Sequence, residues 1–199
     1  MTAKADNVQA DGTYPATGAS LTVNSRGLWG GLLVLGKAPS SFKGDVSELQ
    51  IEGIPVSDKN GLYGGSVSDD NSGTMQYISI RHGGAEIGEG NEINGLTLGG
   101  VGSGTVIDHI EVIANVDDGI EFFGGTVNAS YLLVWGQGDD ALDIDQAYSG
   151  TIDDAYVILE DASDHGMEID GPEGSAAGSF TAVSYTHLRA HETDSYLVC

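Results

Sequence analysis

Apolar and polar residues alternate in a short pattern that returns along the second half of the chain. Each copy has a polar pair, a small residue and an apolar–polar–apolar triplet, as in residues 117–122, Asp-Asp-Gly-Ile-Glu-Phe. The small residues of the four copies are Gly95, Gly119, Ala141 and Gly166, which places the copies 24, 22 and 25 residues apart. A fixed period in the low twenties is typical of a solenoid, in which each repeat stacks on the next.

A second apolar run precedes each of the last three copies, at residues 110–113, 132–135 and 156–159. The alternating triplets predict strands with one buried face, whereas the continuous runs predict strands shielded on both faces. With glycine-rich corners and few helix signals, this pattern favours an all-β parallel β-helix of about 22–25 residues per coil. A leucine-rich repeat would need a Leu/Asn consensus that the copies lack.

The composition narrows the classes of partner. The formal net charge of −23 disfavours nucleic acid, whose phosphates the chain would repel, and favours cations or a cationic partner. Hydrophobic residues make up 40% of the chain, which excludes wholesale disorder. No run of about 18 apolar residues predicts a membrane span, and the first residues lack the apolar core of a signal peptide.

The last 17 residues differ from the rest of the chain. Residues 183–199 read VSYTHLRAHETDSYLVC, in which the Gly/Asp texture stops, and the string resembles a translated sequencing adapter. We therefore expect residues 1–182 to be a β-helix fragment truncated at both ends, with 1–26 irregular or an incomplete first coil. Residues 183–199 are expected to be a non-native, unstructured tail. The single cysteine, Cys199, lies in this tail, so no disulfide is expected.

Several motifs resemble those of a known group of proteins. They lie, in order, at residues 26–32, 50–55, 69–74, 77–84, 91–98 and 117–125. In this order and spacing the chain resembles right-handed parallel β-helix repeat proteins of Gram-negative cell surfaces, a group of predicted lipoproteins and secreted proteins of unassigned function. The resemblance implies a right-handed helix and an extracellular or outer-membrane location, with a lipid anchor in the full-length protein. It supplies no catalytic residue.

Stacking the coils predicts two acidic columns. The turn column lies before each triplet and consists of Asp117, Asp139 and Asp164, with Asp118, Asp140 and His165 beside it. The strand column is an outward acidic face, consisting of Glu121, Asp143 and Glu168 and extended by Asp145 and Asp170. Neighbouring coils lie about 4.8 Å apart, and two carboxylates at about 5 Å repel by roughly 3 kcal/mol at an effective dielectric of about 20. Partly shielded columns therefore need raised pKa values or a bound cation.

Ca²⁺ is the candidate cofactor, because this hard cation takes six to eight oxygen ligands. Its candidate ligands are Asp117, Asp118, Asp139, Asp140 and Asp164. The alternative is structural: turn-forming aspartates that hydrogen-bond their own backbone beneath a solvated acidic face. On either interpretation we expect a secreted or surface-anchored acidic scaffold or binding module, with surface or matrix glycans as partners.

The competing function is a carbohydrate-active enzyme, either a polysaccharide lyase or a polygalacturonase-like hydrolase. Its candidate catalytic residues are Asp117, Asp118, Asp139, Asp140 and His165, with Asp118 and Asp140 as the acid pair that a glycosidase needs. The Arg-x-Lys motif of the hydrolases is absent. No lysine or arginine lies within the acidic coils to serve as the base of a lyase. The sequence therefore favours a binding role over catalysis.

Overall fold

The structure is a computed structural model that describes residues 1, 21–87 and 93–189. Its strands in chain order are β1 (Leu32–Leu35), β2 (Leu49–Gln50), β3 (Leu62–Tyr63), β4 (Thr74–Arg81), β5 (Leu96–Gly99), β6 (Val106–Ile113), β7 (Ile120–Phe123), β8 (Asn128–Trp135), β9 (Leu142–Asp145), β10 (Thr151–Leu159), β11 (Glu168–Gly171) and β12 (Thr181–Arg189). A 3₁₀ helix, η1 (Lys59–Gly61), joins β2 to β3. Within the described part of the chain, no helix has the length and apolar character needed to cross a bilayer.

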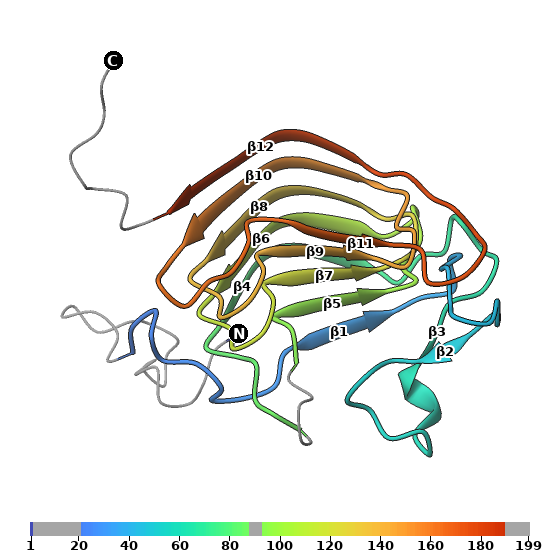
Figure 1. Cartoon of the computed structure of the whole chain (residues 1–199), viewed down its shortest axis with the longest axis horizontal. Helices are drawn as coiled ribbons and strands as arrows, with labels where there is room; N and C mark the ends of the chain where they lie inside the picture. The colour runs from blue at the N-terminus through green and yellow to red at the C-terminus, as the bar shows by residue number, and fades with distance from the viewer. Residues whose placement is uncertain (2–20, 88–92, 190–199) are drawn as a thin grey trace.

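The strands wind into a right-handed parallel β-helix, as predicted (Figure 1). Short strands stack in the order β1-β5-β7-β9-β11 and long strands in the order β4-β6-β8-β10-β12. Each short strand is followed along the chain by a long one, so the pairs β1–β4, β5–β6, β7–β8, β9–β10 and β11–β12 are successive coils. We call the two stacks the short-strand sheet and the long-strand sheet.

The core lies between the two sheets and is built from residues that stack in register. Ile120 pairs with Leu142 and Phe122 with Ile144, and all four side chains are buried. The expected alternation of the triplets is thereby confirmed for their inward positions. Each such side chain contributes about 1.5–3 kcal/mol by leaving water, so the repeated apolar positions hold the coils together.

Close stacking also explains a glycine that opens a triplet. A Cβ on Gly119 would lie 2.6 Å from the carbonyl oxygen of Ala141 and 2.3 Å from a methyl carbon of Val134. Its N–H donates to the carbonyl of Asp140 in the next coil, at 2.9 Å. A side chain at this position would push two adjacent coils apart.

The long strands bend at one position per coil, where a residue adopts a left-handed conformation. The corner residues are Tyr77, His109, Tyr131, Asp154 and Ser184, with φ between 52° and 55°. Parallel pairing continues on both sides of this corner, for example from Asp108↔Ser130 to Ile110↔Leu132. The long strands therefore begin about four residues before the apolar runs that predicted them, and the polar half of each was missed.

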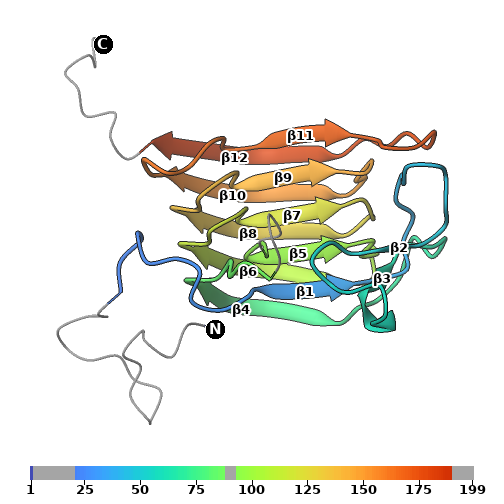
Figure 2. The same ribbon diagram turned by 60° about the horizontal axis from the view of Figure 1, so that its bottom comes forward.

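The sequence predicted one buried face for the short strands and two buried faces for the long strands, and the structure shows the reverse. The middle short strands β5 and β7 are buried at every residue, whereas the long strands keep one partly exposed outer face. The reason is the excursion between β1 and β4, which carries β2 and β3 and lies against β1 and β5 in Figure 2. Phe42, Ile51 and Tyr63 from this segment pack with Phe123 in a second apolar cluster outside the short-strand sheet.

The two ends differ in how far the predictions hold. Residues 21–26 contain no strand, and residues 2–20 lie outside the described residues. The expectation of an unstructured tail from residue 183 is wrong for residues 183–189, because β12 continues through them in parallel register with β10. That register pairs His187 with Val157 and Arg189 with Leu159, so the backbone follows the solenoid while the apolar column is broken. Residues 190–199 lie outside the described residues.

Candidate functional site

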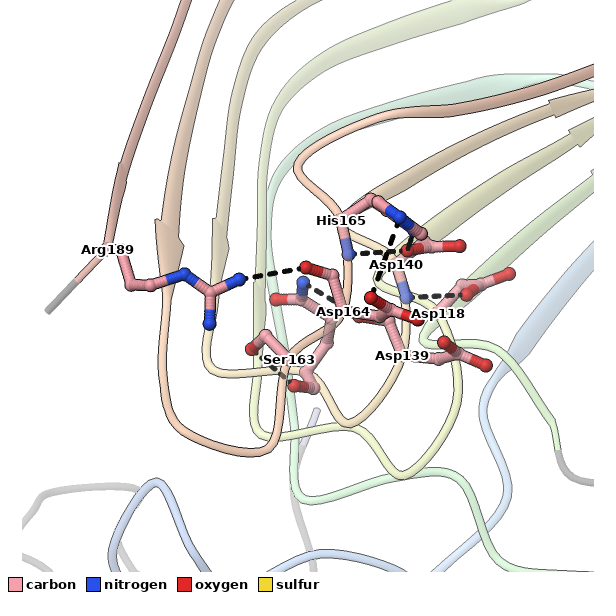
Figure 3. A network of polar contacts seen from close by, with 8 residues as sticks. Asp118, Asp139, Asp140, Ser163, Asp164, His165 and Arg189 are labelled. Atoms are coloured by element: carbon pink, nitrogen blue, oxygen red, sulfur yellow. Dashed lines mark hydrogen bonds and ion pairs between the residues drawn. The ribbon is translucent and has the colours of Figure 1, made fainter. Parts of the chain in front are cut away.

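The residues just before the short strands form a ladder that joins one coil to the next. Asn94, Asp118, Asp140 and His165 occupy this position on successive coils. The Oδ1 atom of Asp118 accepts a hydrogen bond from the main-chain N–H of Asp140 at 3.0 Å, and Oδ1 of Asp140 accepts one from the N–H of His165 at 2.7 Å (Figure 3). The predicted stacking of Asp118 over Asp140 is therefore present, and each carboxylate helps to fix the next turn.

The turn column lies at the solvent side of this ladder. Asp139 and Asp164 are exposed, Asp117 is half-buried, and the N–H of Asp164 donates to the carbonyl of Asp139 at 2.9 Å. Oxygens of Asp117, Asp118 and Asp139 lie within 4.8 Å of one another, as do those of Asp139, Asp140 and Asp164. Partial burial, followed by the charges of Asp140 and Asp164, raises the pKa of Asp139. The structure thus brings the predicted candidate metal ligands together in two overlapping groups.

The strand column is not the continuous exposed face that the alternation predicted. Glu121 pairs with Asp143, and Asp143 with Glu168, as expected, but Glu121 and Asp143 are only 7% and 8% exposed. Burial, followed by the charges of Asp143, Asp118 and then Glu52, raises the pKa of Glu121, so the β2–β3 excursion, which carries Glu52, lies near this residue. Open acidic surface remains at the last coil, where Asp170 is exposed and Glu168 half-buried, with Asp145 half-buried beside it.

The ladder and the strand column meet in an enclosed cluster that neither column predicted alone. One oxygen each from Asp118, Glu121 and Asp143 lies within 4.8 Å of the others, and all three residues are buried. Asn94 is 2% exposed and donates a short hydrogen bond from Nδ2 to Oε2 of Glu121. We call Asn94, Asp118, Glu121 and Asp143 the enclosed cluster.

Two oxygens of the enclosed cluster lack hydrogen-bond partners. Oδ1 of Asn94 and Oδ1 of Asp143 are buried, and no group in the described part of the chain bonds to either. An unpaired buried oxygen is costly, at about 1–3 kcal/mol, so Oδ1 of Asp143 indicates a missing partner beside the other two carboxylates. Asn94 was not singled out from the sequence, although its position before Gly95 matches that of Asp118 before Gly119.

Crowding of the acids raises their pKa values in the metal-free protein. Burial, followed by the charges of Asp117 and Asp143, raises the pKa of Asp118 to about 9, and burial raises that of Asp143 to about 6. Burial and the neighbouring Asp143 hold the pKa of Glu121 well above its usual range. Three carboxylates in this space need protons or a cation to offset a repulsion of roughly 3 kcal/mol per pair at about 5 Å.

An acid–base pair lies at the last rung of the ladder. Nδ1 of His165 lies 2.9 Å from Oδ1 of Asp140, and Nε2 lies 3.6 Å from Oδ1 of Asp164. The hydrogen bond to Asp140, followed by the charges of Asp140 and Asp164, raises the pKa of His165. The imidazole is 57% exposed, whereas the Asp140 side chain is 4% exposed, so only the histidine of this pair can meet a ligand. Glu168 lies beside them, and its hydrogen bond with Asp140, followed by burial, raises its pKa to about 7.

The pair proposed for glycosidase chemistry has a structural role in this geometry. Asp118 and Asp140 are 7% and 3% exposed, and each gives an oxygen to the main chain of the next coil. A glycosidic bond could not come between them without opening the coil. The histidines are not grouped either: His82 is buried against the carbonyl of Ser25, and His109 lies at the long-strand corner, away from His165.

Comparison with known proteins identifies the fold family. A family model described as a pectate-lyase-like β-helix domain matches residues 3–191. No curated protein and no solved structure matches the chain. The family match spans the coils that carry the ladder, the turn column and the enclosed cluster.

Proposed function

The chain belongs to the family of pectate-lyase-like β-helix domains, and on that premise we propose that it is an acidic β-helix scaffold that binds Ca²⁺ and glycans. The fold supports a scaffold role, because stacked coils present side chains at fixed intervals along a stiff axis. The finer parts of the proposal, the cation and the glycan, are supported by the arrangement of the acids.

The observation that carries the proposal is the enclosed cluster. Ca²⁺ binds oxygens at about 2.3–2.6 Å, so two ligands of one ion lie at most about 5 Å apart. Asp118, Glu121 and Asp143 meet that condition with oxygens within 4.8 Å, and Asn94 and Asp143 each hold an oxygen with no partner among the described residues. The three carboxylates are hard oxygen ligands of the kind that Ca²⁺ prefers, whereas softer metals prefer sulfur and nitrogen ligands.

The exposed turn column supports a second Ca²⁺ site, whose ion would contact a ligand. The oxygens of Asp139, Asp140 and Asp164 converge at the surface, where a bound Ca²⁺ would leave coordination positions open to a ligand. Such an ion would offset the repulsion between this acidic surface and an anionic glycan. We include surface or matrix glycans as ligands on this ground. We also propose a location at the cell surface of a Gram-negative bacterium. This location rests on the sequence resemblance and is tested by fractionating cells that express the protein.

Thermal melting tests the cation. The midpoint of unfolding in EDTA is compared with that in Ca²⁺ and in Mg²⁺, for the wild type and for Asp143→Asn. We expect Ca²⁺ to raise the midpoint of the wild type and to have little effect on the variant, since the variant loses a charged ligand. Asp154→Asn is the matched control, because this exposed carboxylate lies on the long-strand sheet and belongs to neither candidate Ca²⁺ site. A wild-type midpoint that does not move with millimolar Ca²⁺ removes the cation from the proposal.

A carbohydrate-active enzyme remains the second candidate, and the Asp140–His165 pair is the observation that favours it. A buried carboxylate that orients an exposed imidazole is an arrangement suited to general acid–base catalysis. The reacting groups would be His165 and Glu168, which can meet a ligand, rather than Asp118 and Asp140. The wild type and His165→Gln are assayed on pectin, alginate and neutral polysaccharides for reducing ends or unsaturated products. If neither protein releases reducing ends or unsaturated products, the enzyme hypothesis is rejected.

A further inference from the structure

Three aromatic rings form an exposed column at the corner of the long-strand sheet. Tyr77, His109 and Tyr131 occupy the corner position on β4, β6 and β8. The ring centroids of Tyr77 and His109 lie 4.5 Å apart, and those of His109 and Tyr131 also 4.5 Å apart, with interplanar angles of 30° and 29°. Tyr77 is 77% exposed and Tyr131 is 52% exposed. We call these three residues the aromatic column.

The bend does not require aromatic residues. Asp154 and Ser184 occupy the same corner on β10 and β12 with φ values of 52° and 54°, within a few degrees of the 55° of Tyr131. Left-handed backbone favours glycine, asparagine and aspartate, and a bulky side chain there is strained. The rings therefore occupy positions that a smaller polar residue fills elsewhere in the same solenoid, and the corner itself gives no reason for them.

A row of polar side chains runs beside the aromatic column. Gln76, Asp108, Ser130 and Asp153 precede the corner residues and stand in register on neighbouring strands. Oδ1 of Asp108 bonds to Nδ1 of His109, and Oδ2 accepts a hydrogen bond from Oγ of Ser130 at 3.2 Å. On β4, β6 and β8 a ring and a polar side chain thus stand next to each other in the chain, and each such pair lies about 4.8 Å from the pair on the next coil.

We propose that the aromatic column and this polar row bind a neutral glycan chain. His109 is stacked between the two tyrosines, so Tyr77 and Tyr131 each keep one face that it does not cover. Such a face packs against the C–H face of a sugar, while neighbouring oxygens accept hydrogen bonds from the sugar hydroxyl groups. The charges select the class of glycan, because Asp108, Asp153 and Asp154 disfavour a carboxylated or sulfated chain at this corner. β4 is the last strand of its sheet in the described residues, and its outer edge bonds to Met1 at Ser79 and Arg81, beyond the corner residue Tyr77, which provides the first stacking surface.

This inference rests on the proposed glycan-binding function and names a second surface for it, away from the short-strand sheet. Affinity electrophoresis of the full chain through gels that contain laminarin, hydroxyethylcellulose or galactomannan tests it. Gels with alginate or polygalacturonate, each with Ca²⁺, are the anionic arms. The variant is Tyr77→Asn with Tyr131→Asn, because asparagine accepts the left-handed backbone. Asp154→Asn changes the same corner without a ring and is the matched control.

We expect at least one neutral polymer to retard the wild type and the control, and the double variant to bind it about tenfold more weakly, as the loss of two stacking rings implies. Tyrosine ring signals that shift on titration of the wild type with a laminarin oligosaccharide would support the site without a variant. Equal retardation of the variant and the wild type overturns the aromatic column but leaves glycan binding elsewhere. Retardation by the anionic polymers alone also overturns it, and absence of retardation in every gel rejects this site together with the glycan part of the proposed function.

Discussion

Replacing Asp143 with asparagine should stabilise the protein in EDTA and lose that advantage, or destabilise the protein, in Ca²⁺. Asp143 is 8% exposed, its Oδ1 has no partner among the described residues, and it shares the enclosed cluster with Asp118 and Glu121. Without metal, the carboxylate adds charge to a crowded buried site. With metal, the same charge becomes a ligand.

The two effects are of similar size. In EDTA at about pH 8, the cluster either ionises a second carboxylate about 5 Å from Asp143, a repulsion of roughly 3 kcal/mol, or keeps protons on Asp118 and Glu121, whose pKa values are raised. Asparagine removes that repulsion and offers an N–H to Glu121, so we expect the variant to gain about 1–3 kcal/mol. At a Ca²⁺ concentration one hundred times the dissociation constant, the wild type gains about 2.7 kcal/mol, or roughly 5–10 °C in the midpoint for a chain of this length.

Urea unfolding followed by circular dichroism measures the free energy of unfolding in EDTA and in Ca²⁺. The variant should be more stable than the wild type in EDTA and no more stable, or less so, in Ca²⁺. Asp139→Asn removes a ligand of the turn column and should retain the part of the Ca²⁺ response that comes from the enclosed cluster. If Asp139→Asn loses the response and Asp143→Asn keeps it, the ion lies in the turn column and the argument from the enclosed cluster is wrong. If neither variant differs from the wild type in its response, none of these acids is a ligand.

Three further predictions concern the ladder and the core. NMR titration should give His165 a pKa above the ordinary value of about 6.5, and Asp140→Asn should lower it. Because the folded-state pKa is raised, the stabilisation from this pair is complete below the unfolded pKa and is lost as pH rises through the folded value. An unshifted histidine would contradict the hydrogen bond. Leu142→Ala should lower the free energy of unfolding by about 2–5 kcal/mol in urea, and a loss below about 1 kcal/mol would contradict a packed interior. Gly119→Ala should cost several kcal/mol, since its Cβ would lie 2.6 Å from the carbonyl oxygen of Ala141, and a variant as stable as the wild type would show that the coils can separate there.

The stacking of the coils could be predicted from the sequence because it depends on local repetition. The small residues at Gly95, Gly119 and Ala141 mark the same point of each coil, and the structure places their N–H groups on carbonyls of the next coil. The same spacing puts Asp118 over Asp140. Neither inference needs knowledge of any segment outside the repeat.

The covering of the sheets could not be predicted in the same way. It depends on the excursion between β1 and β4, whose Ile51 and Tyr63 pack against Phe123 from some sixty to seventy residues away in the chain. A segment that does not repeat leaves no periodic signal of where it docks. For that reason Glu121, which has Glu52 of that segment nearby, was expected on an open acidic face and is instead buried.

The edge-to-edge pairing of the long strands has a mechanical consequence. β6, β8 and β10 are joined to their neighbours by hydrogen bonds that run along the solenoid axis. On the other side, Ser41 and Asp45 of the first coil bond to Gln146 and to residues 173–175 of the later coils. Tension applied across the two ends would load the bonds between neighbouring strands in series. Once the bonds of Ser41 and Asp45 to the later coils have broken, the coils should peel in steps of one turn, about 22–25 residues of released chain at a time. Force spectroscopy would then record a sawtooth with that spacing.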